Sequence, residues 1–357
     1  MDEEHPTVPT WTPEPPPQRR RLGPGLVAIV MAALLLFGGV GLFAARQMAA
    51  TGTGATSPEA AASGLLAALD RKDLDRAADY LDQDERLLVG TYRDRVVALI
   101  AGQLTGTPDE LDLTARDVRF RRVTGSGGPD VAVVELVSGI VGGRGPRGAK
   151  LELPAEELNR RLAQDTKGAV TALRVVTVRA DDRWHVSLLA TAAEYARAAG
   201  RGGQPDWGLL GARDQATAGA ASPEAAVRDL AAALQANPDR AVDRLAPGER
   251  LVLRAYQRSA PAGALPDPST LGLSVKGLTT RTERIADDVA RVHLTGGTVQ
   301  RQGGAGSRTE PPLDLDRLDP EHPTPYVVTI QRDGTWYPSL VFTATDWMLT
   351  RTERERP

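Results

Sequence analysis

The spacing of hydrophobic residues changes along the chain from a helical period to strict alternation, and this change happens twice. Between residues 57 and 99 apolar side chains recur three and four positions apart, as in Ala62, Leu65, Leu66 and Leu69. Such spacing is expected of one face of an amphipathic helix. From Leu111 onward apolar and polar residues alternate, which is typical of half-buried strands. The pattern predicts helices first and strands second.

The same order of elements is repeated in the second half of the chain. The opening Ser57-Pro58-Glu59-Ala60-Ala61 returns as Ser222-Pro223-Glu224-Ala225-Ala226. Farther on, Glu85-Arg86-Leu87…Tyr92 returns as Glu249-Arg250-Leu251…Tyr256. Internal repetition on this scale indicates two copies of one structural unit. We therefore expect two α+β units, over residues 57–199 and 222–350, joined by a Gly- and Ala-rich linker over 200–221.

Each unit is expected to begin with capped helices and to end in a strand that carries a tryptophan. Ser57 is suited to cap a helix whose first residue is Pro58. The predicted strands of the first unit lie at 111–123, 131–137, 151–153, 173–179 and 184–190, with a helical insert at 155–164. Trp184 and its counterpart Trp336 are interpreted as core residues of the last strand rather than as a ligand platform.

The residues ahead of the first unit suggest a membrane anchor. Residues 1–25 form a Pro-rich tail, which predicts disorder. The uncharged run 26–45 is long enough for a transmembrane helix, and Arg19-Arg20-Arg21 before it predicts a cytoplasmic N-terminus. Residues 46–56 read as a spacer and 351–357 as a charged, solvated tail. The alternative is a cleaved signal peptide with Ala49-Ala50 as its processing site.

Composition excludes several classes of function. The chain of 357 residues has 43 Lys and Arg against 46 Asp and Glu, so it lacks the basic excess that binds nucleic acid. It has no cysteine, which excludes disulfides and thiolate chemistry. The four histidines, His5, His185, His293 and His322, are dispersed, so no metal site or other cofactor is expected.

The opening Ser-Pro-Glu-Ala-Ala, the Asp-x-x-Arg-Ala at Asp73 to Ala77 and the closing Asp182-Arg183-Trp184 resemble the NTF2-like (cystatin-like, cone-shaped α+β) superfamily. More narrowly, the units are similar to NTF2-like modules that follow a membrane anchor in actinobacterial envelope proteins, such as the module ahead of some transpeptidase domains. No serine here has lysine three residues later. The resemblance therefore implies the accessory module, without transpeptidase activity.

Two kinds of site were considered within this fold. Related isomerases place an acid and a tyrosine inside the cone, which would point to Tyr92 or Tyr256 with Glu135 or His293. Helical spacing with Leu88 favours a core role for Tyr92. The second kind is the pair of Gly/Arg loops, where Arg144, Arg147, Arg301 and Arg308 are candidates for binding an anion or a partner. The alternative for those loops is a solvated hairpin tip.

The leading hypothesis is a non-catalytic binding protein of the bacterial cell envelope, at the plasma membrane, with both units outside the cell. Its expected partner is an envelope protein or a small apolar ligand. An extracytoplasmic enzyme is the alternative. Val131, Val133 and Val137 predict an apolar outer sheet face in the first unit, against Val289, Arg291 and His293 in the second. We expect the two units to pack on each other as a monomeric pseudo-dimer.

Overall fold

The fold was analysed in a computed structural model, which describes residues 54–104, 113–144, 150–200, 202–211, 219–259, 273–301, 313–317 and 324–354. The first unit opens with α2 (Pro58–Asp70), α3 (Leu74–Asp79) and α4 (Gln83–Leu104). As predicted, Ser57 caps α2, since its Oγ accepts a hydrogen bond from the backbone N–H of Ala60 at 3.1 Å. The helix buries Ala62, Leu65, Leu66 and Leu69, which confirms the helical spacing.

Helix α2 packs on an antiparallel sheet made of the strands that follow. These are β1 (Leu113–Gly127), β2 (Val131–Arg144), β3 (Lys150–Pro154), β4 (Arg174–Ala180) and β5 (Arg183–Ser187). They lie in the order β1-β2-β4-β5, with β3 paired to β2. Alternate residues of β2 face opposite sides, so Ala132, Val134 and Leu136 join the core under α2. Trp184 is buried in the same core, as expected.

Two further helices complete the first unit. Helix α5 (Ala155–Asp165) lies between β3 and β4, in agreement with the predicted insert. Its Asn159 side chain accepts from the backbone N–H of Leu173 and donates to the carbonyl of Leu136, both at 2.9 Å. Helix α6 (Leu188–Ala199) follows β5 without a loop. The sequence had predicted a strand as far as residue 190, so this closing helix was missed.

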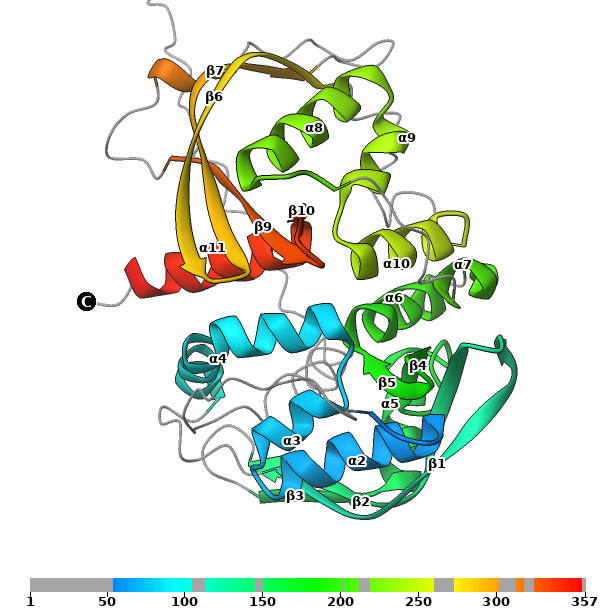
Figure 1. Ribbon diagram of the computed structural model, residues 1–357. Helices are drawn as coiled ribbons and strands as arrows, with labels where there is room; N and C mark the ends of the chain where they lie inside the picture. Colours follow the sequence, from blue (N-terminus) through cyan, green and yellow to red (C-terminus); the bar gives the residue numbers. More distant parts are fainter. Residues whose placement is uncertain are drawn as a thin grey trace, which may run out of the picture.

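The second unit repeats this order of elements, as Figure 1 shows. Its helices are α8 (Pro223–Ala236), α9 (Pro238–Ala241), the 3-10 turn η3 (Val242–Arg244) and α10 (Pro247–Gln257). Its strands β6 (Leu273–Ala286), β7 (Val289–Arg301), β8 (Leu313–Asp314), β9 (Tyr326–Arg332) and β10 (Thr335–Ser339) pair in the equivalent order. Helix α11 (Leu340–Arg354) closes the unit and corresponds to α6.

One element differs between the units. Between β3 and β4 the first unit has the eleven-residue helix α5, whereas the residues that the structure describes between β8 and β9 include the 3-10 turn η5 (Leu315–Arg317). The predicted linker also contains a short helix, α7 (Trp207–Gly211), and the predicted charged tail begins inside α11. These are corrections to the element boundaries expected from the sequence.

The two units share two buried clusters. In one of them Val131 and Val133 pack with Leu251 and Val252 of α10, so the second unit helps to cover the outer sheet face of the first. In the other, Leu88 and Tyr92 of α4 pack with side chains of the second unit that include Val289, Val328, Ile330 and Phe342. Figure 1 shows these helices between the two sheets, with α4 beside α11 and α10 beside α6 and α7. That the chain is a monomer in solution stays a prediction.

Hydrogen bonds also cross the boundary, and each joins the third helix of one unit to the closing helix of the other. Tyr256 of α10 donates to Glu194 of α6 at 3.4 Å. Arg95 of α4 donates to Asp346 of α11 at 2.9 Å, and Asp346 also accepts from Arg291. Glu194 and Asp346 each occupy the seventh position of the closing helix of their unit. The boundary therefore has an approximate two-fold relation within one chain.

The last strand of each sheet pairs at its outer edge with one residue that lies just ahead of the first helix of the unit. Ala55 and Trp184 exchange backbone hydrogen bonds of 2.9 and 2.8 Å, and Ala220 and Trp336 exchange bonds of 3.0 and 2.8 Å. Gly54 has a φ of +91°, and a Cβ there would lie 2.6 Å from the His185 ring. A glycine is required at this approach because the chain passes so close to the strand.

The predicted fold class is wrong in one part, the transmembrane helix. Among the helices in the described ranges, none has both the length and the apolar sequence needed to cross a bilayer. The longest, α4, carries Asp84 and Glu85 in its first turn and the charged run Arg93-Asp94-Arg95 at its middle. The expected span 26–45, the tail 1–25 and most of the spacer lie outside the described residues. The plasma-membrane location stays a prediction.

Candidate functional site: a carboxylate-lined cavity between the units

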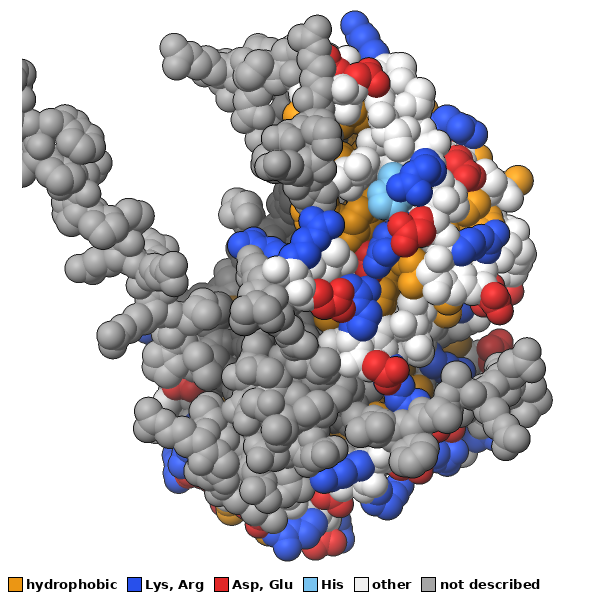
Figure 2. All heavy atoms as spheres, turned by 90° about the vertical axis from the view of Figure 1, so that its left-hand side faces the viewer, with side chains coloured by type: hydrophobic (Ala, Val, Ile, Leu, Met, Phe, Trp, Pro, Cys, Tyr) orange, Lys and Arg blue, Asp and Glu red, His pale blue; other side chains and the backbone are white. Residues whose placement is uncertain are grey.

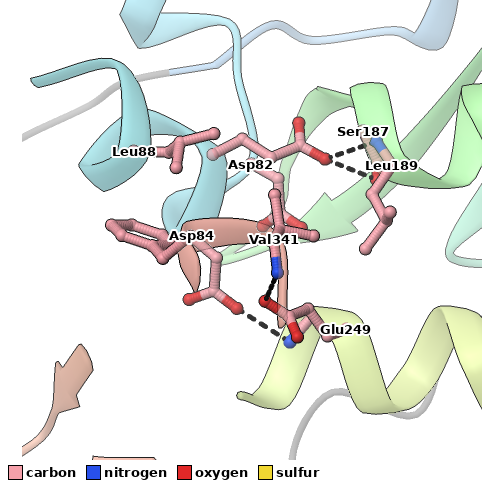
Figure 3. A pocket seen from close by; sticks show the side chains of 10 residues that line it. Asp82, Asp84, Leu88, Ser187, Leu189, Glu249 and Val341 are labelled. Atoms are coloured by element: carbon pink, nitrogen blue, oxygen red, sulfur yellow. Dashed lines mark hydrogen bonds between the residues drawn. The ribbon is translucent and has the colours of Figure 1, made fainter. Parts of the chain in front are cut away.

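A small cavity lies where the two units meet, at the start of α4 and α10. It has a volume of about 30 Å³, which is enough for about one or two water molecules. Its lining comes from both units, and Figure 3 shows the side chains converging on it. The lining residues are Asp82, Asp84, Glu85, Leu88, Ser187, Leu189, Gly248, Glu249, Val341 and Phe342. We call it the central cavity.

Glu85 is a buried carboxylate that the first unit contributes to the lining of the central cavity. Its two oxygens accept hydrogen bonds from Ser187 Oγ at 3.0 Å and from the backbone N–H groups of Leu188 and Leu189 at 2.7 and 2.8 Å. These N–H groups belong to the first turn of α6, so they have no acceptor within the helix itself. A side chain from the third helix of the unit thus caps the closing helix, and the positive end of the helix dipole stabilises the negative form of Glu85.

Glu249 does the same for the second unit. It accepts from Ser339 Oγ, from Leu340 N–H at 2.8 Å and from Val341 N–H at 3.2 Å. The chain therefore builds the same carboxylate cap twice, and both caps border the central cavity.

Burial dominates the electrostatics of this pair. Burial, followed by the charge of Asp82, raises the pKa of Glu85 to about 8, although hydrogen bonds from α6 act in the opposite direction. Burial likewise raises the pKa of Glu249 to about 7, against the hydrogen bonds from Ser339 and α11. Removal of water disfavours the charged form of a carboxyl group. Both groups therefore titrate near neutral pH.

Asp84 ties the two units together beside the cavity. One oxygen accepts from the backbone N–H of Gly248 at 2.8 Å, and the other accepts from Arg332 Nε at 2.6 Å. Both donors belong to the second unit. Because Glu85, Glu249 and Asp84 already accept hydrogen bonds from fixed donors, their chemistry is that of structural caps and clamps.

Two of the arginines proposed from the sequence lie at strand ends. Arg144 ends β2 and pairs through its backbone with Lys150, whereas Arg301 ends β7 opposite Leu273. Arg147 and Arg308 lie outside the described residues. Neither described position belongs to the central cavity.

The residues considered for an isomerase-like site are separated and otherwise engaged. Tyr92 and Tyr256 are buried in the two shared clusters at the boundary, not under α2 or α8. Glu135 forms an ion pair with Arg121 at 2.6 Å, and His293 lies 2.8 Å from a Glu283 oxygen. Within the described ranges no group of three His, Asp or Glu side chains is arranged to hold a metal ion.

The sequence contained a signal for the central cavity that our interpretation did not use. The repeated Glu-Arg-Leu at Glu85 and Glu249 was read only as evidence of duplication. A charged residue kept at equivalent helical positions beside apolar neighbours is a reason to ask what it binds. Its partners are about a hundred positions away in the sequence, so spacing alone does not identify them.

Comparison with known proteins gives no relative for this chain. No protein-family model matches it, and neither the curated proteins nor the solved structures contain a match. The α+β architecture with two antiparallel sheets is compatible with two NTF2-like units, and the resemblance stays a prediction.

Proposed function

We propose that this chain is a non-catalytic binding protein, in which two NTF2-like units form one body and the second unit binds a partner protein. The observation that carries this proposal is the exposed aromatic surface of α11. It lies on the closing helix of the second unit, which corresponds to α6 of the first unit.

In the first unit the equivalent surface is closed. Tyr195, the eighth residue of α6, is only 5% exposed, and its hydroxyl accepts from the backbone N–H of Arg174 at 2.8 Å. Leu162 of α5 belongs to the same buried cluster as Tyr195. Helix α5 thus helps to bury the outer end of this unit.

In the second unit the eighth residue of α11 is Trp347, and it is 43% exposed. Leu340 and Met348 are also exposed on this helix. The Trp347 ring stacks on Tyr326 with centroids 5.6 Å apart, so it is held in place rather than free to rotate. We call Leu340, Trp347 and Met348 the α11 face. Figure 2 shows the side of the molecule on which α11 ends, where hydrophobic surface lies between basic and acidic side chains.

This composition matches known features of protein interfaces. Tryptophan and arginine are among the residues that most often dominate binding energy at protein interfaces. The last turn of α11 is basic, with Arg351 and Arg354. The partner chemistry that fits is an apolar side chain flanked by carboxylates.

The interior of the first unit favours binding over catalysis. The core under α2 is built from Ala, Leu and Val side chains together with Trp184 and Tyr195. The buried carboxylates of the central cavity already accept hydrogen bonds from helix N-termini. A general base needs access to a substrate proton, and these groups are turned toward the backbone instead.

The test places a photo-crosslinking residue at position 348 of the full chain, in place of the exposed Met348 and beside an intact Trp347, followed by reconstitution with the purified captured protein. We expect Trp347→Ala to weaken binding and to raise the dissociation constant by about 30-fold or more, as for an interface hot spot. The matched control is Val137→Ala, an exposed apolar residue of the first unit, which should leave the affinity unchanged. A captured protein that binds Trp347→Ala as tightly as wild type, or no capture at position 348, refutes the proposal.

A further inference from the structure

A second, larger cavity lies in the first unit, at the junction of α5, β4 and α6. Its volume is about 460 Å³, within the usual range of about 300–1,000 Å³ for small-molecule sites. Lys167, Gly168 and Ala169 border it just beyond α5, and Arg174 borders it at the start of β4. Arg197, Ala198 and Gly202 complete the lining. We call it the basic cavity.

The lining residues of the basic cavity include basic side chains and no acidic side chain. Three of the seven lining residues are basic and the other four are Gly or Ala. Arg197 is neutralised by Glu194, which contacts it at 2.6 and 2.7 Å. Arg174 is not neutralised to the same degree. Its Nε lies 3.9 Å from Glu135, and it is buried with no hydrogen-bond partner among the described residues.

Lys167 adds a second uncompensated charge at the rim. Its side chain is exposed, and its backbone has a φ of +51°, followed by Gly168 at +79°. Glycine or asparagine is usual where a helix ends in this left-handed conformation. A lysine in this backbone conformation is strained relative to glycine. Lys167 nevertheless occupies this position and borders the basic cavity.

The second unit shows that the fold does not require these cations. Arg174 is the first residue of β4, and the first residue of β9 is Tyr326. Arg197 is the tenth residue of α6, and the tenth residue of α11 is Leu349. Both replacements are buried in a shared cluster. One copy of the unit therefore packs this region with apolar side chains, whereas the other holds a half-buried guanidinium beside an open volume.

We propose that the basic cavity binds a small, doubly charged anion of the phosphate class. Arg174 has only the long ion pair with Glu135, and Lys167 adds a second positive charge to the lining, so a dianion complements the two charges. Hydrogen bonds from a guanidinium to phosphate are charge-assisted and strong. The size of the basic cavity leaves room for an organic group attached to the anion. This site is distinct from the α11 face and does not depend on partner binding there.

The experiment titrates the full chain with inorganic phosphate by calorimetry, with ionic strength held constant by sodium chloride. Wild type should bind phosphate saturably at one site, and Arg174→Gln should weaken binding by about 10-fold to 100-fold, the effect of losing one charge-assisted hydrogen bond. Arg160→Gln is the matched control, since Arg160 is an exposed arginine of α5 that does not line the cavity. It should bind as wild type does.

Lys167→Ala provides a second variant whose folding is not at risk, because the Lys167 side chain is exposed. It should also weaken phosphate binding, by a smaller factor than Arg174→Gln. The proposal is overturned if wild type shows no saturable phosphate binding above chloride. It is equally overturned if Lys167→Ala and a folded Arg174→Gln both bind as tightly as wild type does.

Discussion

The two units have the same strand order and the same capped helices, but they differ in how side chains pack around the closing helix, α6 in the first unit and α11 in the second. The first unit places α5 over the end of its sheet and leaves a cationic cavity beside that helix. The second unit packs Tyr326 and Leu349 at the positions equivalent to Arg174 and Arg197, and it exposes Trp347. Two units with the same framework thus differ in their candidate sites, a small-molecule site in the first and a protein-binding site in the second.

The strongest test of the comparison asks whether the units are energetically separate. Val133 is fully buried in the cluster shared with α10. Val133→Asp would place an unpaired charge there, and we expect a loss of about 4 kcal/mol or more in the free energy of unfolding. Because both units supply that cluster, chemical denaturation should show one transition that shifts as a whole. Two transitions, of which one stays in place, would contradict the shared core.

The next test contrasts a buried tryptophan with the exposed one. Trp184→Ala should cost about 3–5 kcal/mol, the usual penalty for deleting a large core side chain. Trp347→Ala should change stability by only about 0.5–1 kcal/mol, since the ring is held by a single stacking contact at the surface. Thermal melts of both variants measure this. Equal destabilisation would mean that Trp347 is part of the core and not of a binding surface.

A third test uses pH to compare the two carboxylate caps. The pKa values of Glu85 and Glu249 are about 8 and about 7 in the fold, above the ordinary value of 4.5. The folded chain therefore holds these protons more tightly than the unfolded chain does. Their contribution to stability is complete below pH 4.5 and is lost as pH rises through 7 and 8.

We thus expect the free energy of unfolding to be larger at pH 5.5 than at pH 8.5, by a few kcal/mol in order of magnitude. Glu85→Gln should flatten this dependence more than Glu249→Gln, since the Glu85 carboxyl is shifted further. Denaturant titrations at a series of pH values provide the measurement. A dependence that both variants leave unchanged would assign the titration to other groups.

The smallest expected effect concerns the capping serines, where the units should behave alike. Ser57 accepts from Ala60 N–H at 3.1 Å, and Ser222 accepts from Ala225 N–H at 3.2 Å. Ser57→Ala and Ser222→Ala should each cost about 1 kcal/mol. Measured by chemical denaturation, a difference well beyond the error would show that α2 and α8 depend on their caps to different degrees, despite the same geometry.

Local patterns were sufficient for the repeated framework. Apolar spacing and a serine cap define α2, and alternation defines β2, because these features depend on near neighbours. The closing helices α6 and α11 were missed because each begins directly after a strand. The residue that caps each of them, Glu85 or Glu249, lies far away in the sequence. The predicted strand through residue 190 followed the apolar run without that long-range information.

Neither candidate site could be read from the sequence. The Gly/Arg loops drew attention because they combine charge with glycine. The basic cavity instead uses Arg174, Arg197 and Lys167 from three separate segments. Which arginine keeps an uncompensated charge depends on the positions of Glu135 and Glu194 in the folded chain. The exposure of Trp347 likewise depends on how α11 packs in the folded chain, which its helical spacing alone does not determine.

The short backbone bridges at Ala55 and Ala220 have a consequence for how this chain behaves among its own copies. An unpaired strand edge offers hydrogen-bonding groups to any other extended chain and is a frequent start of aggregation. Here one edge strand of each sheet, β5 or β10, already exchanges hydrogen bonds with a residue just ahead of the unit. A protease cut or a truncation at residue 57 would remove the first bridge together with Ala55, which is buried in the core of the first unit. The backbone groups of Trp184 would then be open to pairing with another chain, although Val186 would keep its bonds to Tyr80 and Asp82.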